Sequence, residues 1–202
     1  MLSMEVLGPS LSEIIKNRKS PFSPRQVLQV AIQLMERLSC IHSRGILHRD
    51  LKPSNLVIGI DNNKDVIYMI DFGLSKVFIN QNTHTQIPFQ DGLRVTGTAP
   101  FASLSAHEGH EQSPKDDLEC VGYVLVYLAK GSLPWYNSTT KKPANIQQAL
   151  ADIKEKKLST TIEELCEGVP HPIQNLFLEC QRLKYEDVPD YKNLAQLFSF
   201  YL

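Results

Sequence analysis

The chain has 202 residues, of which 42% are hydrophobic and 21% are charged. This balance predicts a single globular domain and excludes the disordered and fibrous classes. Lysine and arginine total 21 against 22 aspartate and glutamate residues, which gives a net charge of -1. We therefore expect no general attraction to nucleic acid or to an anionic membrane surface.

The longest apolar run, residues 121–129, is about half of the roughly 20 residues that a membrane-spanning helix needs. It predicts a buried core helix, and no membrane association is expected. The first ten residues contain no basic segment followed by an apolar stretch and a cleavage site, so we expect no secretory signal and a location in the cytoplasm, the nucleus or both. The cysteines form no CxxC pair, and their apolar helical contexts predict buried, reduced thiols with no disulfide partner: Cys40, Cys120, Cys166 and Cys180.

The first strong helical pattern begins at Ser23-Pro24, repeats apolar residues at threes and fours up to Ile41, and is expected to end at Gly45. The stretch 46–59 follows, and its Lys-Pro dipeptide forbids a continuing helix. Its short apolar flanks predict a loop held between brief strands. Next, residues 65–74 alternate in a way that predicts a strand buried on both faces and ending at Asp71.

Residues 75–113 are rich in Thr, Gln, Gly and His and have little periodicity, so we interpret them as a binding or activation segment. Asp116 and Asp117 then precede an apolar helix that runs to Ala129 and is closed by Gly131. This helix is expected to form the core of the domain. Amphipathic helices are also predicted in three later segments, 143–157, 171–184 and 190–202.

Two motifs carry residues suited to phosphoryl transfer, HRDLKPSN at 48–55 and DFG at 71–73. That reaction needs an aligned hydroxyl, divalent metal on the phosphates and positive charge over the transition state. Asp50 would accept the proton of the attacking hydroxyl, and Lys52 would neutralise the transferring phosphate. Asn55 and Asp71 would bind magnesium through their oxygens.

Taken alone, an HRD or a DFG sequence is weak evidence for a catalytic site, because either sequence also occurs in ordinary turns and charge clusters. Asp71 follows Asp50 by 21 positions, a spacing that supports the functional interpretation of the pair. Other polar features have simpler explanations. His107 and His110 do not form the HExxH pattern of zinc hydrolases and are interpreted as surface loop residues, and Lys156-Lys157 as solvated charges.

Further blocks follow these motifs in order: TGTAPFAS, EQSPKDDLECVGYVLVYL, GSLPW, KKLSTTIEELCEGVP and PDYKNLAQLF. Together they resemble protein kinases over nearly the whole chain. GSLPW, the KKLST block, the final block and Ser103-Leu104-Ser105 in place of Ala-Pro-Glu favour the casein kinase 1 family. The resemblance implies a kinase-like C-terminal lobe, mainly α-helical with short strands around the catalytic loop and the DFG segment. It also implies ATP and Mg²⁺ as cofactors and Ser/Thr-bearing proteins as substrates.

The resemblance further implies roles for individual residues. In the nucleotide cleft, Met4 corresponds to the gatekeeper, Glu5 to Leu7 to the hinge that meets adenine, and Val57 to the apolar floor. Asp117 corresponds to the acid that braces the catalytic loop, and Thr98 to a residue that touches Asp50 and Lys52 and favours Ser or Thr acceptors.

Residues 1–202 are interpreted as a partial kinase domain, with a hinge at about 4–8 and the N-terminal lobe missing. Only three residues precede Met4, and no GxGxxG occurs among the ten glycines. The loss of each preorganised contact typically costs ~10² to 10³ in rate, so the chain alone is expected to be inactive or very weak. Its cleft-facing apolar side would be exposed unless another chain or segment covers it.

Leu93 and Pro100 stand where the family's pocket for phosphorylated substrates has a lysine and an arginine, and Pro114-Lys115 replace an arginine pair. Arg94 is adjacent but offset, and the sequence leaves open whether a preference for primed substrates carries over. Three other hypotheses remain open: a free-standing pseudokinase lobe that acts as a protein-interaction module, a split enzyme completed by another chain, and a small-molecule kinase of related fold.

Overall fold

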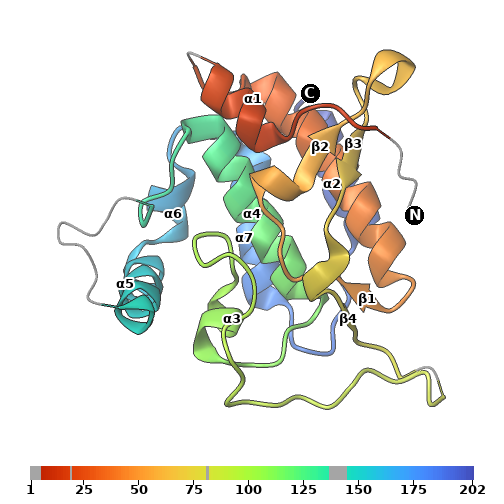
Figure 1. The fold of residues 1–202 in the computed structure, drawn as a ribbon, viewed down its shortest axis with the longest axis vertical. Helices are drawn as coiled ribbons and strands as arrows, with labels where there is room; N and C mark the ends of the chain where they lie inside the picture. The colour runs from red at the N-terminus through yellow and green to blue at the C-terminus, as the bar shows by residue number, and fades with distance from the viewer. Residues whose placement is uncertain (1–5, 19, 81, 137–144) are drawn as a thin grey trace.

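The structure, a computed structural model, describes residues 6–18, 20–80, 82–136 and 145–202. Within these ranges the chain forms eight α-helices and four short strands (Figure 1). This mainly helical content agrees with the expected kinase-like fold. The helices are α1 (Leu11–Asn17), α2 (Pro24–His42), α3 (Leu104–Glu108), α4 (Pro114–Lys130), α5 (Ile146–Ser159), α6 (Ile162–Cys166), α7 (His171–Arg182) and α8 (Tyr191–Phe200).

Helix α2 is one of the two long helices of the core. The side chain of Ser23 accepts a hydrogen bond from the backbone of Gln26, whose own side chain returns to the backbone of Ser23, and Pro24 occupies the first turn. The buried face of the helix packs against α4 and α8, and its residues include Val27, Leu28, Ala31, Leu34, Met35 and Leu38. Helix α2 ends at His42, three residues before the expected Gly45.

Helix α4 is the second long helix, and it packs against both α2 and α7. A side chain at Gly122 would place its Cβ only 2.6 Å from Phe177, so glycine allows this close approach. The helix begins at Pro114 and ends at Lys130, and Gly131 caps it in the left-handed conformation. Asp116 and Asp117 therefore lie inside its first turn and are buried, instead of preceding it as the sequence suggested.

The four strands form two antiparallel pairs. Strand β2 (Leu56–Ile58) pairs with β3 (Ile67–Met69), and β1 (Ile46–Leu47) pairs with β4 (Lys76–Val77). The extended residues 8–10 also run along β2, since Gly8 donates to the carbonyl of Ile58 over 2.8 Å. The two pairs hold the connecting loops 48–55 and 70–75 beside each other.

Several local expectations were wrong. Strand β3 is shorter than the predicted strand and, with one partner strand, leaves Tyr68 and Met69 half-buried. Helices α1 and α6 were not predicted, whereas α5, α7 and α8 fall within or near the three predicted segments. Cys40 is exposed because it lies outside the buried stripe of α2; the other three cysteines are buried, and all four are free. No helix among the described residues is long and apolar enough to cross a membrane.

Candidate active site

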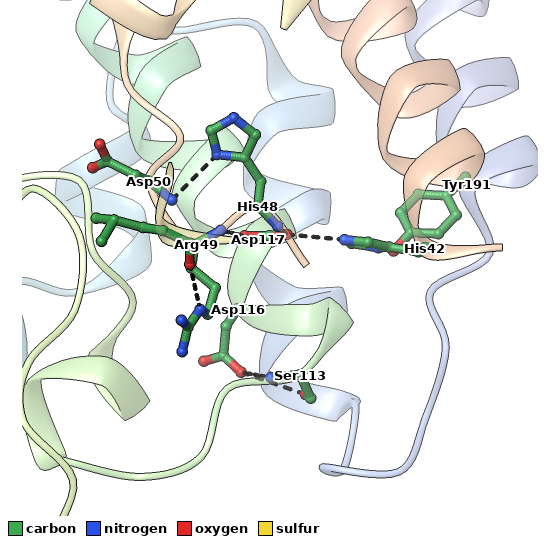
Figure 2. Close-up of polar contacts among 9 residues, drawn as sticks. His42, His48, Arg49, Asp50, Ser113, Asp116, Asp117 and Tyr191 are labelled. Carbon is green, nitrogen blue, oxygen red and sulfur yellow. Dashed lines mark hydrogen bonds and ion pairs between the residues drawn. The ribbon is translucent and has the colours of Figure 1, made fainter. Parts of the chain in front are cut away.

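The site is built on the carboxylate of Asp117, in the first turn of α4. Its Oδ2 accepts hydrogen bonds from the backbone of His48 (2.7 Å) and from Nε2 of His42 (3.0 Å), and its Oδ1 accepts from the backbone of Arg49 (2.8 Å). Figure 2 shows Asp117 between His42 on α2 and the loop that carries Asp50. A single buried side chain thus fixes the backbone that precedes Asp50.

These donors determine the charge of Asp117. Burial acts to raise the pKa of its carboxyl group, but the hydrogen bonds from His42, His48 and Arg49 outweigh burial and lower the pKa. The hydroxyl of Tyr191 in turn contacts Nδ1 of His42. Since a carboxylate only accepts, Nε2 of His42 carries a proton and donates to Asp117. Burial raises the pKa of Tyr191, so this hydroxyl stays protonated.

His48 is fully buried and connects the loop to the neighbouring strand. Its Nε2 lies 3.0 Å from the carbonyl of Ile70, which can only accept, so Nε2 is the donor. Nδ1 then accepts a 3.3 Å hydrogen bond from the backbone of Asp50. Arg49 adopts a left-handed conformation (φ 65°) and donates to the carbonyl of Leu74 over 2.8 Å. Both residues thus tie the loop to the DFG segment.

The carboxylate of Asp50 is the point at which the predicted residues meet. Lys52 donates to its Oδ2 over 2.7 Å, and Thr98 donates to its Oδ1 over 2.7 Å. The amide group of Asn55 bonds both the carbonyl (2.9 Å) and Oδ2 (3.2 Å) of Asp50. Lys52 also donates to the Thr98 hydroxyl over 2.9 Å. Four residues predicted from sequence therefore share one hydrogen-bonded cluster.

Gly97 allows Thr98 to reach Asp50. Its φ of +95° is rarely adopted by residues with a side chain, and a Cβ there would lie 2.5 Å from the carbonyl oxygen of Arg49. The backbone of the 97–98 turn consequently lies directly against loop 48–55. Any larger residue at position 97 would separate the two segments.

The predicted magnesium ligands also lie near each other. The backbone of Ile70 donates to the carbonyl of Asn55 over 3.0 Å, which places Asp71 one residue beyond this contact. Asp71 is exposed, has a φ of 64° and accepts a 3.3 Å hydrogen bond from the backbone of Gly73. Since the Asn55 amide nitrogen is directed at Asp50, its amide oxygen and the Asp71 carboxylate are the available groups. Two hard oxygen donors suit Mg²⁺.

The residues assigned to the adenine region are only partly described. Val57 is buried in β2, where it pairs with Tyr68 and forms a bridge to Ser10. Leu7 is half-buried at the start of the segment that runs along β2. Met4 and Glu5 lie outside the described residues.

Two predictions about polar residues were wrong. His107 is buried, not a surface residue, and its Nε2 lies 2.9 Å from the carbonyl of Ala99. Burial, with the nearby charge of Lys157, lowers the pKa of His107 to about 4. Lys157, interpreted as solvated, is only 4% exposed. The local sequence does not indicate that either residue is buried, because the burial arises from packing between elements that are distant in the chain.

An ion pair that no sequence motif indicated lies at the ends of the 75–113 segment. Lys76 on β4 donates to both carboxylate oxygens of Glu111 (2.9 and 2.8 Å), and Glu111 is only 2% exposed. This pair joins the two ends of the segment. It explains how a stretch with little secondary structure keeps a defined position beside Asp50.

The family model of the protein kinase domain matches residues 1–189. The chain therefore belongs to the protein kinase family. Members of this family are phosphotransferases that use ATP and Mg²⁺ and act on proteins.

Proposed function

We propose that the protein is a Ser/Thr kinase of casein kinase 1 type, which transfers the γ-phosphoryl group of ATP to protein hydroxyls. The observation that carries this proposal is the cluster at Asp50, whose carboxylate accepts hydrogen bonds from Lys52, Asn55 and Thr98. The blocks that resemble casein kinase 1, including Ser103-Leu104-Ser105, support the narrower assignment.

In the proposed reaction, Asp50 accepts the proton of the acceptor hydroxyl while that oxygen forms a bond to phosphorus and the bond to the leaving oxygen of ADP breaks. Lys52 supplies positive charge beside the transferred group. Asn55 and Asp71 would hold Mg²⁺, which when bound neutralises phosphate charge. Asp117 does not react, but it keeps the backbone of His48 and Arg49, and hence Asp50, in position.

The surface near Thr98 bears on substrate choice. Leu93 is exposed and Pro100 is partly exposed, and neither carries a charge. Lys76, a cation at the start of the 75–113 segment, is paired with Glu111 through both carboxylate oxygens. We propose that acceptors need not carry a phosphorylated or acidic residue.

An exposed apolar face adjoins the site. Phe72, Leu74 and Val77, which lie one, three and six residues after Asp71, are 42%, 42% and 48% exposed. We propose that a further segment or a partner chain covers this face and completes the nucleotide cleft, and that the 202-residue chain alone turns over very slowly. The same face favours the second candidate function, a pseudokinase lobe that binds a protein partner.

Calorimetric titration with Mg-ATP and an Asp50→Asn substitution together test the proposal. The wild-type chain is expected to bind nucleotide at micromolar to millimolar concentration and to transfer labelled phosphate slowly to a mixed Ser/Thr protein substrate. Asp50→Asn is expected to reduce transfer by at least ~10²-fold, because the base is lost, with little change in nucleotide affinity.

Asp65→Asn, at an exposed loop position, is the matched control and should leave transfer unchanged. Unaltered transfer by Asp50→Asn would remove Asp50 from the role of base. No heat of binding at millimolar nucleotide, together with no transfer, would favour the interaction module over the enzyme.

A further inference from the structure

Three buried side chains, two from helices and one from the turn that follows α4, donate to the backbone that follows Thr98. His107 on α3 donates to the carbonyl of Ala99 over 2.9 Å, and Trp135 donates to the carbonyl of Pro100 over 2.7 Å. Lys157 on α5 donates to the carbonyl of Ala102. We call His107, Trp135 and Lys157 the carbonyl clamp.

The held segment leads directly to the active site. The backbone groups of Phe101 and Ala102 both donate to the carbonyl of Thr98, over 2.9 and 3.0 Å, so residues 98–102 form one compact turn. The hydroxyl at the start of this turn bonds Asp50 and Lys52. Because the turn is closed by its own hydrogen bonds, a shift of its carbonyls moves the Thr98 hydroxyl as well.

The surroundings of Lys157 show that its charge is poorly compensated. Its ammonium nitrogen lies 4.2 Å from the ring centroid of Tyr123 and 5.0 Å from that of Trp135. Burial lowers the pKa of Lys157 to about 8, against a smaller opposing effect of Glu119 and Cys120. An apolar side chain of similar length would fill this space without a desolvated charge. Packing alone therefore does not account for the lysine, whereas its hydrogen bond to Ala102 does.

We propose that His107, Trp135 and Lys157 are positioning residues that hold Thr98 against Asp50 and thereby set the affinity for the acceptor hydroxyl. This proposal rests on the proposed kinase function for its effect on acceptors. The positioning itself is a property of the folded chain and is measurable without any reaction.

The test compares variants of the full chain that differ in their ability to donate to a carbonyl. Lys157→Met and His107→Leu remove a donor, whereas His107→Gln keeps a nitrogen near the position of Nε2. Lys156→Met changes the exposed neighbour of Lys157 and serves as the surface control. Amide hydrogen exchange is measured by NMR at Phe101 and Ala102, which report on the turn, and at His48 and Arg49, which report on the Asp117 contacts.

Lys157→Met and His107→Leu are expected to accelerate exchange at Phe101 and Ala102 at least about tenfold, with His48 and Arg49 unchanged. His107→Gln and Lys156→Met should match the wild type. Equal acceleration at all four amides would mean a general loss of stability, and no acceleration would mean that the clamp does not hold the turn. Either result overturns the proposal, and if Lys157→Met does not fold, the His107→Leu and His107→Gln pair decides it alone.

Phosphate transfer provides the second measurement. Lys157→Met and His107→Leu are expected to raise the KM for a protein acceptor at least fivefold while the KM for ATP stays unchanged. A purely structural role would not change one KM and leave the other constant. An unchanged acceptor KM would overturn the acceptor role. If the wild-type chain neither binds Mg-ATP nor transfers phosphate, the kinase function fails, while the exchange measurement still decides whether the clamp holds the turn.

Discussion

Two buried charges lie beside the active site, Asp117 at the start of α4 and Lys157 near the end of α5, and their surroundings differ. Asp117 accepts three hydrogen bonds, which lower its pKa despite burial. Lys157 donates to one carbonyl and lies over two aromatic rings, and burial lowers its pKa to about 8. Loop 48–55 is thus held by a charged group whose ionised form favours folding. The turn at residues 98–102 is held by a charged group whose ionised form opposes folding at neutral pH.

The strongest test of this contrast is the substitution Asp117→Ala. It leaves a buried histidine and two backbone N–H groups without an acceptor, so we expect the free energy of unfolding to fall by about 3–5 kcal/mol. Urea unfolding followed by circular dichroism measures the change. Asp65→Ala at an exposed position should change it by less than about 0.5 kcal/mol. A loss below about 1 kcal/mol for Asp117→Ala would mean that this carboxylate does not hold the loop.

The pH dependence of stability tests Lys157. Its pKa is about 8 in the folded protein against 10.5 for an ordinary lysine, so between these values the unfolded chain binds more protons and stability rises with pH. Relative to Lys157→Met, the free energy of unfolding of the wild-type protein should increase by about 2 kcal/mol between pH 7 and pH 9.5. Parallel urea unfolding of both proteins at the two pH values measures this gain. A constant difference between them would show that the folded lysine titrates normally.

A smaller effect is expected for Tyr191→Phe. The lost hydroxyl leaves Nδ1 of His42 without its hydrogen-bond partner, and His42 supports Asp117 from the side opposite loop 48–55. We expect a loss of about 1 kcal/mol in the free energy of unfolding. Thermal and urea unfolding against Tyr201→Phe, a change at a half-exposed tyrosine, measure it. Equal stability of the two variants would show that the Tyr191 hydroxyl does not stabilise the His42–Asp117 contact.

Much of the helical core could be predicted because its signals are local. Ser23-Pro24 marks the start of α2, and Gly131 marks the end of α4. The signal for α1 was also present, since Ser10 and Glu13 form a capping box, although the helix has only seven residues. Likewise, Cys40 falls between the buried positions of α2, so its exposure follows from the periodicity.

The candidate site could be predicted in part for a similar reason. Asp50, Lys52 and Asn55 lie in one short loop, so a motif of eight residues includes all three. The contact of Tyr191 with His42, which supports Asp117 from behind, could not be predicted this way, because the two residues are 149 positions apart. The burial of His107 and Lys157 likewise depends on how α3 and α5 pack. A polar residue buried by packing has the same sequence context as a solvated one.

The carbonyl clamp engages main-chain oxygens and leaves the side chains of Ala99, Pro100 and Ala102 out of the contact. Backbone placement and surface chemistry are therefore separable along this turn. Substitutions at Pro100, which is partly exposed, can diversify what the surface recognises while the distance from Thr98 to Asp50 stays constant. That position is therefore a suitable starting point for directed evolution of new acceptor preferences.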